Sequence, residues 1–416
     1  MNHLSYMEKL LDGVEVEWKK LADVFQLKNG YTPSKSKKEF WENGTVPWFR
    51  MDDIRENGQI LDESLQKVSE SAIKGGKLFP ENSIIIATSA TIGEHALIRV
   101  PFLANQRFTN LSLKPVYKDT FNNKFIFYYC FMLADWCKKN TTMSSFASVD
   151  MDGFKKYPFP IPCPNDPKKS LEIQAEIVRI LDAFTATTAE LTAELTAELN
   201  MRKKQYNYYR DQLLSFEEGD IEWKTLEDVA HFANGKGHEK DISEDGKYIV
   251  VNSKFISTDG LVAKYSDSQI CPLFKDDILL VMSDLPNGKA LSKTFIVDED
   301  ERYTLNQRIG GITVKDKSEI LPKFLHYYLD RTPQLLKHDN GVDQTNLRKG
   351  QILEVKVPIL PLQKQEHIVS ILDKFDKLTK SLSEGLPREI ELRQKQYEYY
   401  RDLLLSFPKS HSDEAA

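Results

Sequence analysis

A long internal repeat is the feature that most constrains the fold of this chain. Residues 174–216 align without a gap on residues 365–407, and both copies run from Ile-Leu-Asp to Tyr-Tyr-Arg-Asp. Three short motifs repeat more faintly: Glu-Trp-Lys (17–19 and 222–224), Asn-Gly (29–30 and 234–235) and Asn-Gln-Arg (105–107 and 306–308). Self-similarity at a fixed period means that one structural unit is used twice. The sequence therefore predicts two variable globular segments that alternate with two closely similar helical ones.

The repeated segments have the apolar spacing of a coiled coil. Apolar positions from Ile177 to Leu213, and from Ile368 to Leu404, are separated alternately by four and three residues, with one additional four-residue step in each copy. At a rise of 1.5 Å per residue, about 40 residues form a rod about 60 Å long. Such a rod is too long to pack inside one small domain, so we expect the two rods to pack on each other.

The connectivity favours an antiparallel arrangement of the two rods. Residues 6–18 copy the end of the first helical repeat and the tryptophan that follows it, as though the chain were a circle cut between Phe407 and Met1. Antiparallel rods related by a pseudo-two-fold axis would close that circle. Gly385 and Pro387 lie within the second rod, where proline removes a backbone hydrogen bond. We expect a kink or a break there, with Ser383 capping a restarted helix.

Composition limits the class of protein. The chain has 416 residues, of which 41% are hydrophobic, and this suits two or three domains with buried cores. No apolar run approaches the roughly 20 residues that span a bilayer, and the N-terminus lacks a secretory signal, so the cytoplasm is the expected location. The four cysteines have neither disulfide nor metal-ligand spacing, and we expect all of them to be buried. A net charge of -6 argues against coating DNA by charge alone but allows a local basic face.

Residues 188–199 consist of Thr-Ala-Glu-Leu three times in succession. One interpretation is a good helix-forming unit that was duplicated without functional consequence. The alternative is a ruler, because four residues lengthen a helix by about 6 Å and rotate it by about 40°. One base pair rotates B-DNA by roughly 35°. A unit of this size could therefore adjust the distance between two DNA-reading domains in steps of one base pair.

With these features the chain resembles the specificity subunit of a type I restriction-modification enzyme over essentially its whole length. The resemblance rests on the alternation of two variable domains with two helices, and on the helix ends Arg-Lys-Lys-Gln-Tyr-Asn-Tyr-Tyr-Arg-Asp (202–211) and Arg-Gln-Lys-Gln-Tyr-Glu-Tyr-Tyr-Arg-Asp (393–402). The Thr-Ala-Glu-Leu array is similar to the IC branch of that family.

The resemblance implies a DNA-binding subunit without catalysis of its own. Each variable segment would be a target recognition domain that reads one half of a bipartite, asymmetric site on double-stranded DNA. The helices would set the spacer and dock two modification (methyltransferase) subunits, through which restriction (endonuclease/translocase) subunits join. S-adenosylmethionine, ATP and magnesium would be held by those partners and no cofactor by this chain. The expected divisions are 1–169 (first recognition domain with a short N-terminal helical segment), 170–217 (first spacer), 218–360 (second recognition domain) and 361–416 (second spacer and tail).

Motifs for catalysis are absent from the sequence. It contains neither the Asn/Asp-Pro-Pro-aromatic motif of DNA amino-methyltransferases nor a Walker loop. Glu-x-Lys occurs twice, but its repetition at a junction between rod and domain favours a structural role for Trp18 and Trp223, as for the prolines at 158–164 and 358–361. Asp150 and Asp152 resemble turn carboxylates. Two rival functions stay open: a coiled-coil adaptor that binds proteins without reading DNA, and a self-sufficient methyltransferase or nuclease.

The internal repeat suggests which residues contact DNA. Two domains that read different half-sites cannot specify through the same residues, so shared positions should serve the fold or contact phosphate, and divergent polar positions should read bases. The candidates in the first domain are Lys35, Lys37, Lys38, Arg50, Arg55, Thr88, Ser89, Thr91, Arg107, Lys138, Lys139, Ser144 and Ser145. Those in the second domain are Lys236, His238, Asn252, Lys254, Ser283, Asn287, Lys289, Arg308, Asn346, Arg348 and Lys349.

Each recognition domain is expected to be α+β. Short apolar runs at 84–88, 248–252, 277–282 and 311–314 read as strands, and helical segments at 124–138 and 323–336 would pack beside them. The complete prediction is two α/β recognition domains joined by two long helices, packed as an antiparallel coiled coil with pseudo-two-fold symmetry.

Overall fold

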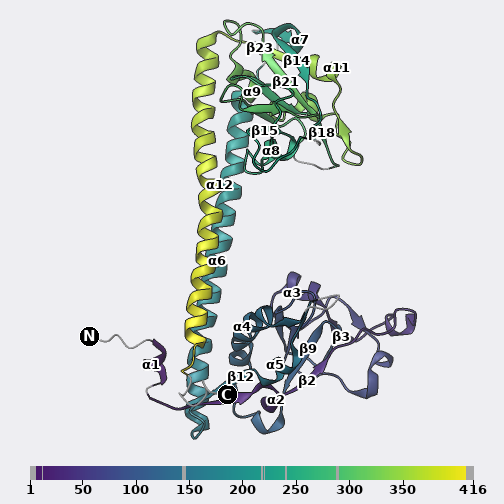
Figure 1. Cartoon of the computed structure of the whole chain (residues 1–416), viewed down its shortest axis with the longest axis vertical. Helices are drawn as coiled ribbons and strands as arrows, with labels where there is room; N and C mark the ends of the chain where they lie inside the picture. The colour runs from purple at the N-terminus through teal and green to yellow at the C-terminus, as the bar shows by residue number, and fades with distance from the viewer. Residues whose placement is uncertain are drawn as a thin grey trace. The chain divides into compact units, whose positions relative to one another are not determined.

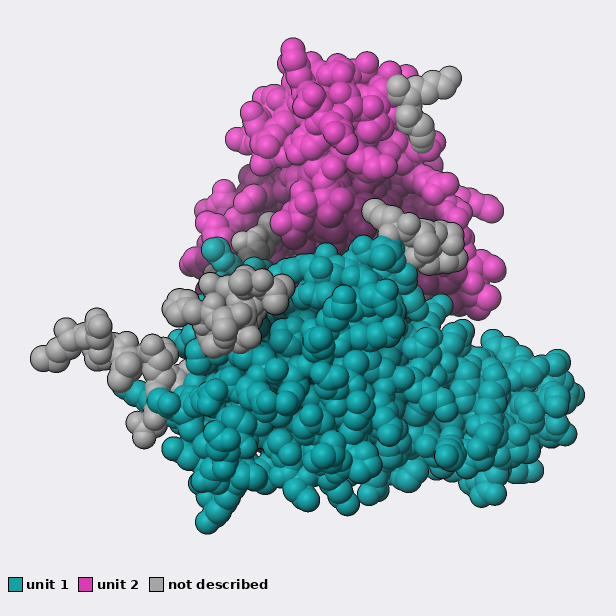
Figure 2. Space-filling view, turned by 60° about the horizontal axis from the view of Figure 1, so that its bottom comes forward, with its two compact units in different colours: residues 1–195, 388–416 teal, residues 196–387 magenta. Residues whose placement is uncertain are grey.

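A computed structural model describes residues 6–11, 13–142, 147–216, 219, 221–238, 241–286 and 290–408, with the backbone alone for residues 6–8 and 379–384. The chain forms two compact units, unit 1 (residues 1–195 with 388–416) and unit 2 (residues 196–387), which Figure 2 distinguishes by colour. Two long helices, α6 (Pro167–Leu213) and α12 (Leu362–Leu405), run through both (Figure 1). Each unit therefore contains the beginning of one long helix and the end of the other.

Unit 1 is a mixed α/β fold built on a five-stranded sheet in the order β2-β9-β6-β7-β4, with a three-stranded sheet β5-β3-β8 beside it. Its strands are β1 (Val16–Lys20), β2 (Phe25–Asn29), β3 (Val46–Phe49), β4 (Ile60–Leu61), β5 (Lys67–Val68), β6 (Ser83–Ala87), β7 (His95–Ile98), β8 (Leu103–Ala104), β9 (Phe108–Leu113), β10 (Thr141–Thr142), β11 (Ser148–Val149) and β12 (Pro158–Pro162). Its shorter helices are α1 (Tyr6–Leu11), α2 (Leu21–Val24), α3 (Met51–Asn57), α4 (Asn123–Lys139) and α5 (Met151–Lys156).

Unit 2 repeats this plan with a four-stranded sheet β14-β21-β17-β19 and a three-stranded sheet β16-β15-β20. Its strands are β13 (Glu222–Thr225), β14 (Ala230–Asn234), β15 (Tyr248–Val251), β16 (Lys264–Ser266), β17 (Ile278–Val281), β18 (Ser283–Asp284), β19 (Thr294–Ile296), β20 (Tyr303–Leu305), β21 (Ile309–Val314), β22 (Thr345–Asn346) and β23 (Lys356–Ile359). Its shorter helices are α7 (Leu226–Val229), α8 (Ser253–Ser257), α9 (Pro322–Leu329), α10 (Pro333–Leu336) and α11 (Lys349–Leu353).

The first and last strands of each globular fold pair with each other. In unit 1, β1 is antiparallel to β12 and places Trp18 opposite Pro160. In unit 2, β13 is antiparallel to β23 and places Trp223 opposite Pro358. The repeated tryptophans and the proline-rich exits are therefore architectural, as predicted.

A buried glutamine and a carboxylate attach the first turns of α6 to unit 1. Gln174 is completely buried; its Oε1 accepts a hydrogen bond from the backbone N–H of Asn122 at 2.9 Å, and its Nε2 donates to the Thr120 carbonyl at 2.9 Å. Two turns later, Asp182 accepts hydrogen bonds from Lys124 Nζ at 2.7 Å and from Tyr128 Oη at 2.8 Å. We call these contacts the docking clamp of α6.

The same clamp recurs in unit 2 on α12. Gln365, also completely buried, accepts from the backbone N–H of Leu321 at 2.8 Å and donates to the carbonyls of Glu319 and Leu360. Asp373 accepts from Lys323 Nζ at 2.7 Å and Tyr327 Oη at 2.8 Å. Burial, together with Asp376 and Asp373, holds the pKa of the Tyr327 hydroxyl well above its ordinary value, so this group keeps its proton as a donor.

The end of the other long helix completes each core. In unit 1, Leu404, Leu405 and Phe407 are buried in the same apolar cluster as Leu11 and the beginning of α6. Trp18 Nε1 donates to the Pro408 carbonyl at 3.3 Å, so β1 and the segment that follows α12 meet in this unit. In unit 2, Leu213, Leu214 and Phe216 pack against the equivalent cluster. Fully burying one Leu or Phe side chain contributes about 1.5 to 3 kcal/mol.

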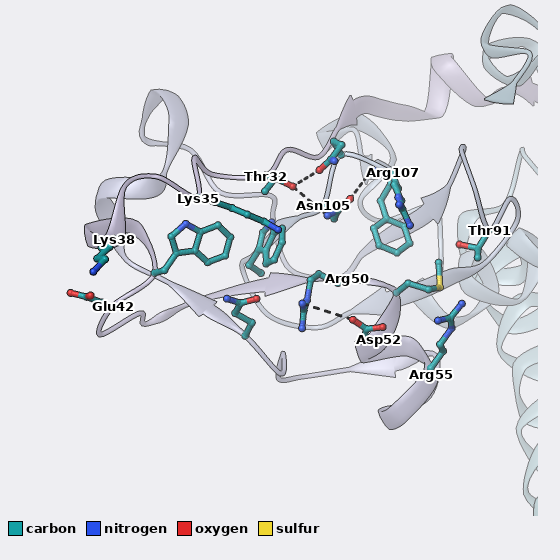
Figure 3. A pocket seen from close by; sticks show the side chains of 16 residues that line it. Thr32, Lys35, Lys38, Glu42, Arg50, Asp52, Arg55, Thr91, Asn105 and Arg107 are labelled. Atoms are coloured by element: carbon teal, nitrogen blue, oxygen red, sulfur yellow. Dashed lines mark hydrogen bonds and ion pairs between the residues drawn. The ribbon is translucent and has the colours of Figure 1, made fainter. Parts of the chain in front are cut away.

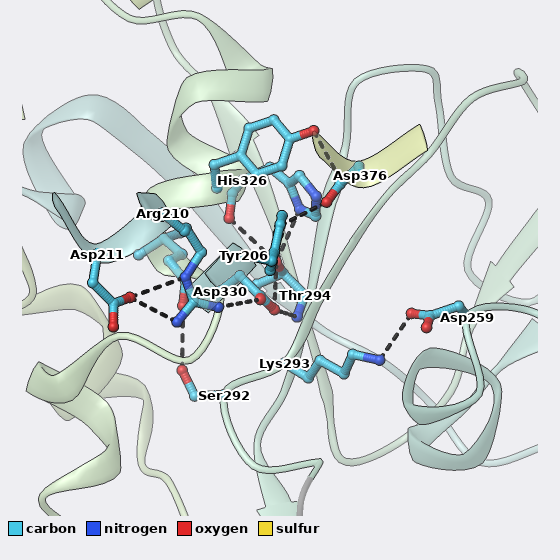
Figure 4. Close-up of polar contacts among 12 residues, drawn as sticks. Tyr206, Arg210, Asp211, Asp259, Ser292, Lys293, Thr294, His326, Asp330 and Asp376 are labelled. Carbon is cyan, nitrogen blue, oxygen red and sulfur yellow. Dashed lines mark hydrogen bonds and ion pairs between the residues drawn. The ribbon is translucent and has the colours of Figure 1, made fainter. Parts of the chain in front are cut away.

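Within each unit the two long helices contact each other through equivalent residues. In unit 2, Tyr206 Oη donates to Asp376 at 2.6 Å (Figure 4), and the rings of Tyr209 and Phe375 stack with centroids 5.8 Å apart. In unit 1, the residues at the corresponding positions of the repeat, 191 residues later or earlier in the chain, are also in contact. There Tyr397 Oη lies 3.0 Å from Thr185 Oγ1, and the rings of Tyr400 and Phe184 are 6.0 Å apart. The sequence repeat is thus also a repeat of contacts.

Several predictions about elements can be compared with the structure. The strand predictions are confirmed by β6, β15, β17 and β21, and the helix at 124–138 by α4. The predicted second helix is divided into α9 and α10, because Pro333 begins a new helix. Of the kink or break expected at Pro387, the break is wrong, since α12 continues through it, and the kink stays a prediction. The cap at Ser383 concerns a side chain outside the described ones. Cys271 is only half-buried, whereas the other three cysteines are buried as expected. Among the described residues, no helix is both long and apolar enough to cross a membrane.

The docking clamp predicts a large cost for removing its glutamine. Gln365→Leu would leave the Leu321 N–H and two carbonyls buried without partners, so we expect a loss of about 3 kcal/mol of stability. Gln363→Leu makes the same chemical change at an exposed position two residues earlier and should alter stability by less than about 0.5 kcal/mol. Denaturant unfolding of the full-length chain measures both; equal unfolding midpoints for the two variants would contradict the clamp.

Candidate nucleic-acid interface

A polar pocket of about 770 Å³ in unit 1 gathers many of the predicted residues (Figure 3). Its wall combines residues of five chain segments: Thr32, Lys35, Lys38, Trp41, Glu42, Trp48, Arg50, Met51, Asp52, Arg55, Gln66, Thr91, Asn105, Gln106, Arg107 and Phe108. Five of these side chains are cationic and two are acidic, so the pocket favours a ligand that is negatively charged or rich in hydrogen-bond acceptors.

The repeated Asn-Gln-Arg motif lines this pocket, and the glycine of the repeated Asn-Gly motif lies directly against it. The last residue of β3, Phe49, accepts a hydrogen bond from the backbone N–H of Asn105 at 2.9 Å. Gly30 crosses directly over the same turn, and a Cβ on Gly30 would overlap the carbonyl oxygens of Ala104 and Asn105. Asn105 Oδ1 accepts from the Arg107 N–H at 3.0 Å, and the Arg107 side chain is exposed. Only glycine permits this crossing, which explains why the two motifs recur together.

The cations around the pocket have few partners within the protein. Among the described residues, Lys35, Lys38, Arg55 and Arg107 make no ion pair, and all four are exposed. Arg50 Nη1 lies 3.8 Å from Asp52, and its guanidinium carbon lies 5.6 Å from the centre of the Trp48 ring. Arg50 Nε and Thr91 Oγ1 are buried without a hydrogen-bond partner in the described part of the chain. The pocket therefore holds donors that the protein itself does not satisfy.

The other candidates of unit 1 lie outside the pocket lining. Lys37 is 3.9 Å from Glu39. Thr88 and Ser89 follow β6; Thr88 Oγ1 bonds Thr109 Oγ1 at 3.0 Å, and Ser89 bridges to Ser148. Lys138 lies against Gly93, near the loop of Thr91, and Lys139 ends α4. Ser144 and Ser145 lie outside the described residues.

Backbone hydrogen bonds bring the candidates of unit 2 together at the equivalent place. Lys236 pairs with Asn306, whose N–H donates to the Val251 carbonyl immediately before Asn252. Ser283 pairs with Asn346, two residues before Arg348, the N-cap of α11. The exposed candidates, with no ion pair among the described residues, are Lys236, Lys254, Arg308, Arg348 and Lys349. Asn287 and Lys289 lie outside the described residues.

Three candidates of unit 2 have other roles in this conformation. His238 is 1% exposed, and both its ring nitrogens are occupied, by the Lys236 carbonyl and by Thr304 Oγ1, each at 2.9 Å. Ser283 is buried and accepts from Gln344 at 2.8 Å. Asn252 is half-buried and caps α8 by accepting from the Phe255 N–H at 2.9 Å. His238 and Ser283 do not fit the predicted contact with DNA, because their side chains are not accessible.

Sequence reasoning overlooked the tryptophans of the pocket. Trp41 and Trp48 lie edge to face at 5.1 Å, and their indole N–H groups donate to the carbonyls of Ser34 and Tyr31, both at 3.0 Å. They hold the loop that carries Lys35 and Lys38. Two of the five tryptophans of the chain lie within the same eight residues of a polar stretch. This clustering was a signal that could have revealed them.

The described residues contain no group of three or more His, Cys, Asp or Glu side chains placed to hold a metal ion. Both Glu-x-Lys motifs are instead used in ion pairs. Lys19 bonds Glu17 at 2.5 Å, and Lys224 bonds Glu319. In both motifs the lysine therefore takes part in an ion pair of the fold.

Comparison with a known protein family matches the chain in two segments. A family model described as the type I restriction modification DNA specificity domain matches residues 13–201 and 218–392. The specificity subunit of the type I restriction enzyme EcoprrI from Escherichia coli is 51% identical over 396 residues, covering 92% of this chain and 93% of that protein. The specificity subunit of EcoR124I/EcoR124II, from the same species, is 35% identical over 443 residues and covers 98% of each.

The fold is also found among solved structures. A chain from a structure concerned with complex assembly and conformational transition of the type I R-M system superposes with a TM-score of 0.71. It is 14% identical, and the match covers 94% of this chain and 97% of that one. At this identity the likeness establishes the fold alone.

Because the imidazole of His238 is buried and hydrogen-bonded, we expect this residue to contribute to stability and not to contact DNA. His238→Ala would remove one of the two hydrogen-bond partners of Thr304 Oγ1 and of the Lys236 carbonyl and would open a buried cavity, so we expect a loss of about 2 to 3 kcal/mol. The duplex affinity of the fraction that stays folded should be unchanged. Thermal unfolding and DNA titration of the same preparation separate the effects; normal unfolding with lost affinity would contradict this assignment.

Proposed function

Because the chain belongs to the family of type I restriction-modification specificity subunits, we propose that its two globular folds each read one half of a split DNA site. The observation that carries the proposal is the repeated turn with an outward arginine, Arg107 in unit 1 and Arg308 in unit 2, flanked in each unit by different polar residues. A shared cation suits the phosphate backbone, which is the same at every site, and divergent neighbours suit bases.

We also propose that the two long helices form an antiparallel coiled coil with pseudo-two-fold symmetry, which holds the recognition domains about one DNA turn apart. The support is the repetition of equivalent contacts within each unit, such as Tyr206 with Asp376 and Tyr397 with Thr185. In this proposal the recognition domains are residues 1–169 and 218–360, and the spacers are residues 170–217 and 361–416.

The helix ends offer a surface for the same partner twice. Met201 and Tyr208 on α6 are 54% and 61% exposed, and their repeat counterparts Leu392 and Tyr399 on α12 are 52% and 64% exposed. Residues seven apart lie on one face of a helix. Exposed apolar side chains do not improve solubility, and these recur in both copies of the repeat. We therefore assign them to docking two modification subunits, one in each unit.

In this function the chain recognises DNA and its partners perform the chemistry. S-adenosylmethionine, ATP and magnesium would be held by the modification and restriction subunits. The test is genome-wide mapping of methylated bases in cells that express this chain with its modification subunit. A bipartite motif with a fixed spacer is the expected result, and a complex that enriches no sequence would favour the adaptor instead.

The Thr-Ala-Glu-Leu array gives a prediction about the spacer. Deleting residues 192–195 removes about 6 Å and about 40° of helix from α6, which is close to the rotation of one base pair. We expect methylation mapping to show the same two half-sites with a spacer about one base pair shorter. Replacing residues 192–195 by four alanines keeps the length and should keep the spacer. An unchanged spacer after the deletion would refute the ruler.

The duplicated surface gives a prediction about stoichiometry. Tyr208→Asp places a charge in one patch, and we expect complexes with a single modification subunit; the double variant with Tyr399→Asp should bind none. Asn207→Asp is the matched control, because it adds the same charge beside the patch and the repeat already has Glu398 at that position. Native mass spectrometry of the assembled complex distinguishes these outcomes, and two bound subunits in the double variant would disprove the assignment.

A further inference from the structure

The two recognition folds can be matched residue by residue around the shared turn. The last residue of the parallel strand, Phe49 in β3 and Val251 in β15, accepts a backbone hydrogen bond from the first residue of the turn in both units, at 2.9 and 3.3 Å. The strands β3 and β15 each pair in parallel with the strand that precedes the turn, β8 and β20. The register of the two folds is therefore the same at this place.

The residue that follows the strand occupies the same position in both folds but differs in type. It is Arg50 in unit 1 and Asn252 in unit 2, and each is the N-cap of the next short helix, α3 or α8. The turn next to it has the sequence Asn-Gln-Arg in both units, although its asparagine Oδ1 accepts from the Arg107 N–H in unit 1 and from the Gln307 N–H in unit 2. An unlike residue beside a shared turn sequence is what two readers of different half-sites need.

The environment of Arg50 leaves its guanidinium available to a ligand. Figure 3 shows Arg50 in the middle of the pocket, between Asp52 and the Asn105 turn. The side chain is 33% exposed, its ion pair with Asp52 is long at 3.8 Å, and its Nε has no hydrogen-bond partner in the described residues. The face of Trp48 lies against the guanidinium, which limits its rotation. A planar donor held in this way is suited to a bidentate acceptor.

The surrounding cations suggest how a duplex is held there. Arg107 and the exposed lysines at 35 and 38 lie around Arg50 in the pocket lining and carry no ion pair in the described structure. They can contact phosphates on either side, while Arg50 reaches the edge of a base. In the major groove, arginine pairs with guanine O6 and N7, and asparagine pairs with adenine N6 and N7.

We propose that the position occupied by Arg50 in the first recognition domain and by Asn252 in the second determines base specificity, and that Arg50 reads a guanine. The inference rests on the proposed function and adds to it the residue and the base. Asn252 now accepts from the Phe255 N–H through its Oδ1, and its Nδ2 remains the donor available to a base. Arg107 is assigned to phosphate.

The experiment maps methylated motifs in cells that express the full-length chain with its modification subunit. Arg50→Asn should lower discrimination for guanine about 10- to 100-fold at one base pair of one half-site, with the other half-site and the spacer unchanged. Arg50→Gln, which also loses the planar fork and favours adenine, should lose the same discrimination and decides the matter if the asparagine variant does not assemble. Arg107→Ala should reduce methylation at all sites and leave the motif intact.

Arg99→Asn is the matched control, since Arg99 is an exposed arginine of unit 1 outside the pocket, paired with Asp62. It should leave both motif and yield unchanged. The proposal is overturned if both Arg50 variants methylate the parental motif, or if they weaken methylation evenly without changing any base preference. A parental chain that yields no bipartite motif would instead overturn the proposed function, so the two failures are distinguishable.

Discussion

The docking clamp at the beginning of each long helix is the interaction on which the rest of the structure depends. Gln174 and Gln365 are completely buried and satisfy backbone groups of the globular fold, so each helix leaves its unit from a fixed position. A buried amide with all partners present is specific in direction, whereas apolar packing alone tolerates sliding. The direction in which α6 and α12 leave their folds is thereby fixed by a few polar atoms.

This constraint accounts for the strong repeat. One part of each copy, with Gln174 and Asp182 or Gln365 and Asp373, is held by contacts to a globular fold. A later part, around Tyr208 and Tyr399, is exposed yet repeated. The clamp segment must fit two globular folds that offer equivalent partners. The exposed segment would bind the same kind of partner in both units. The globular segments lie under no such requirement outside their shared turn, which is why their sequences differ.

The sequence predicted the elements better than the site. The run at 84–88 was predicted because a short apolar, β-branched segment bounded by turn residues is a local pattern, and all residues of β6 are buried. The repeat revealed the unit that is used twice. Arg50 was chosen as a candidate, but its equivalence to Asn252 depends on the parallel pairing of distant strands, which no local pattern encodes. His238 was misjudged because a polar residue in a loop can be buried by a partner 66 residues away, here Thr304. Pro387 remains inside α12 because the helix is held by side-chain contacts on both sides of it.

Unit 1 combines an early and a late segment of the chain, and this orders the events of synthesis. Residues 13–195 emerge from the ribosome well before Leu404, Leu405 and Phe407, and their core lacks these side chains until they are translated. At about 5 to 20 residues per second, the roughly 210 intervening residues take about 10 to 40 seconds to translate. Unit 2, whose residues 196–387 are contiguous, is complete before then. The recognition fold that is made first is therefore the last to be finished. The apolar surface that Leu404, Leu405 and Phe407 later cover stays exposed to water or to chaperones throughout that interval.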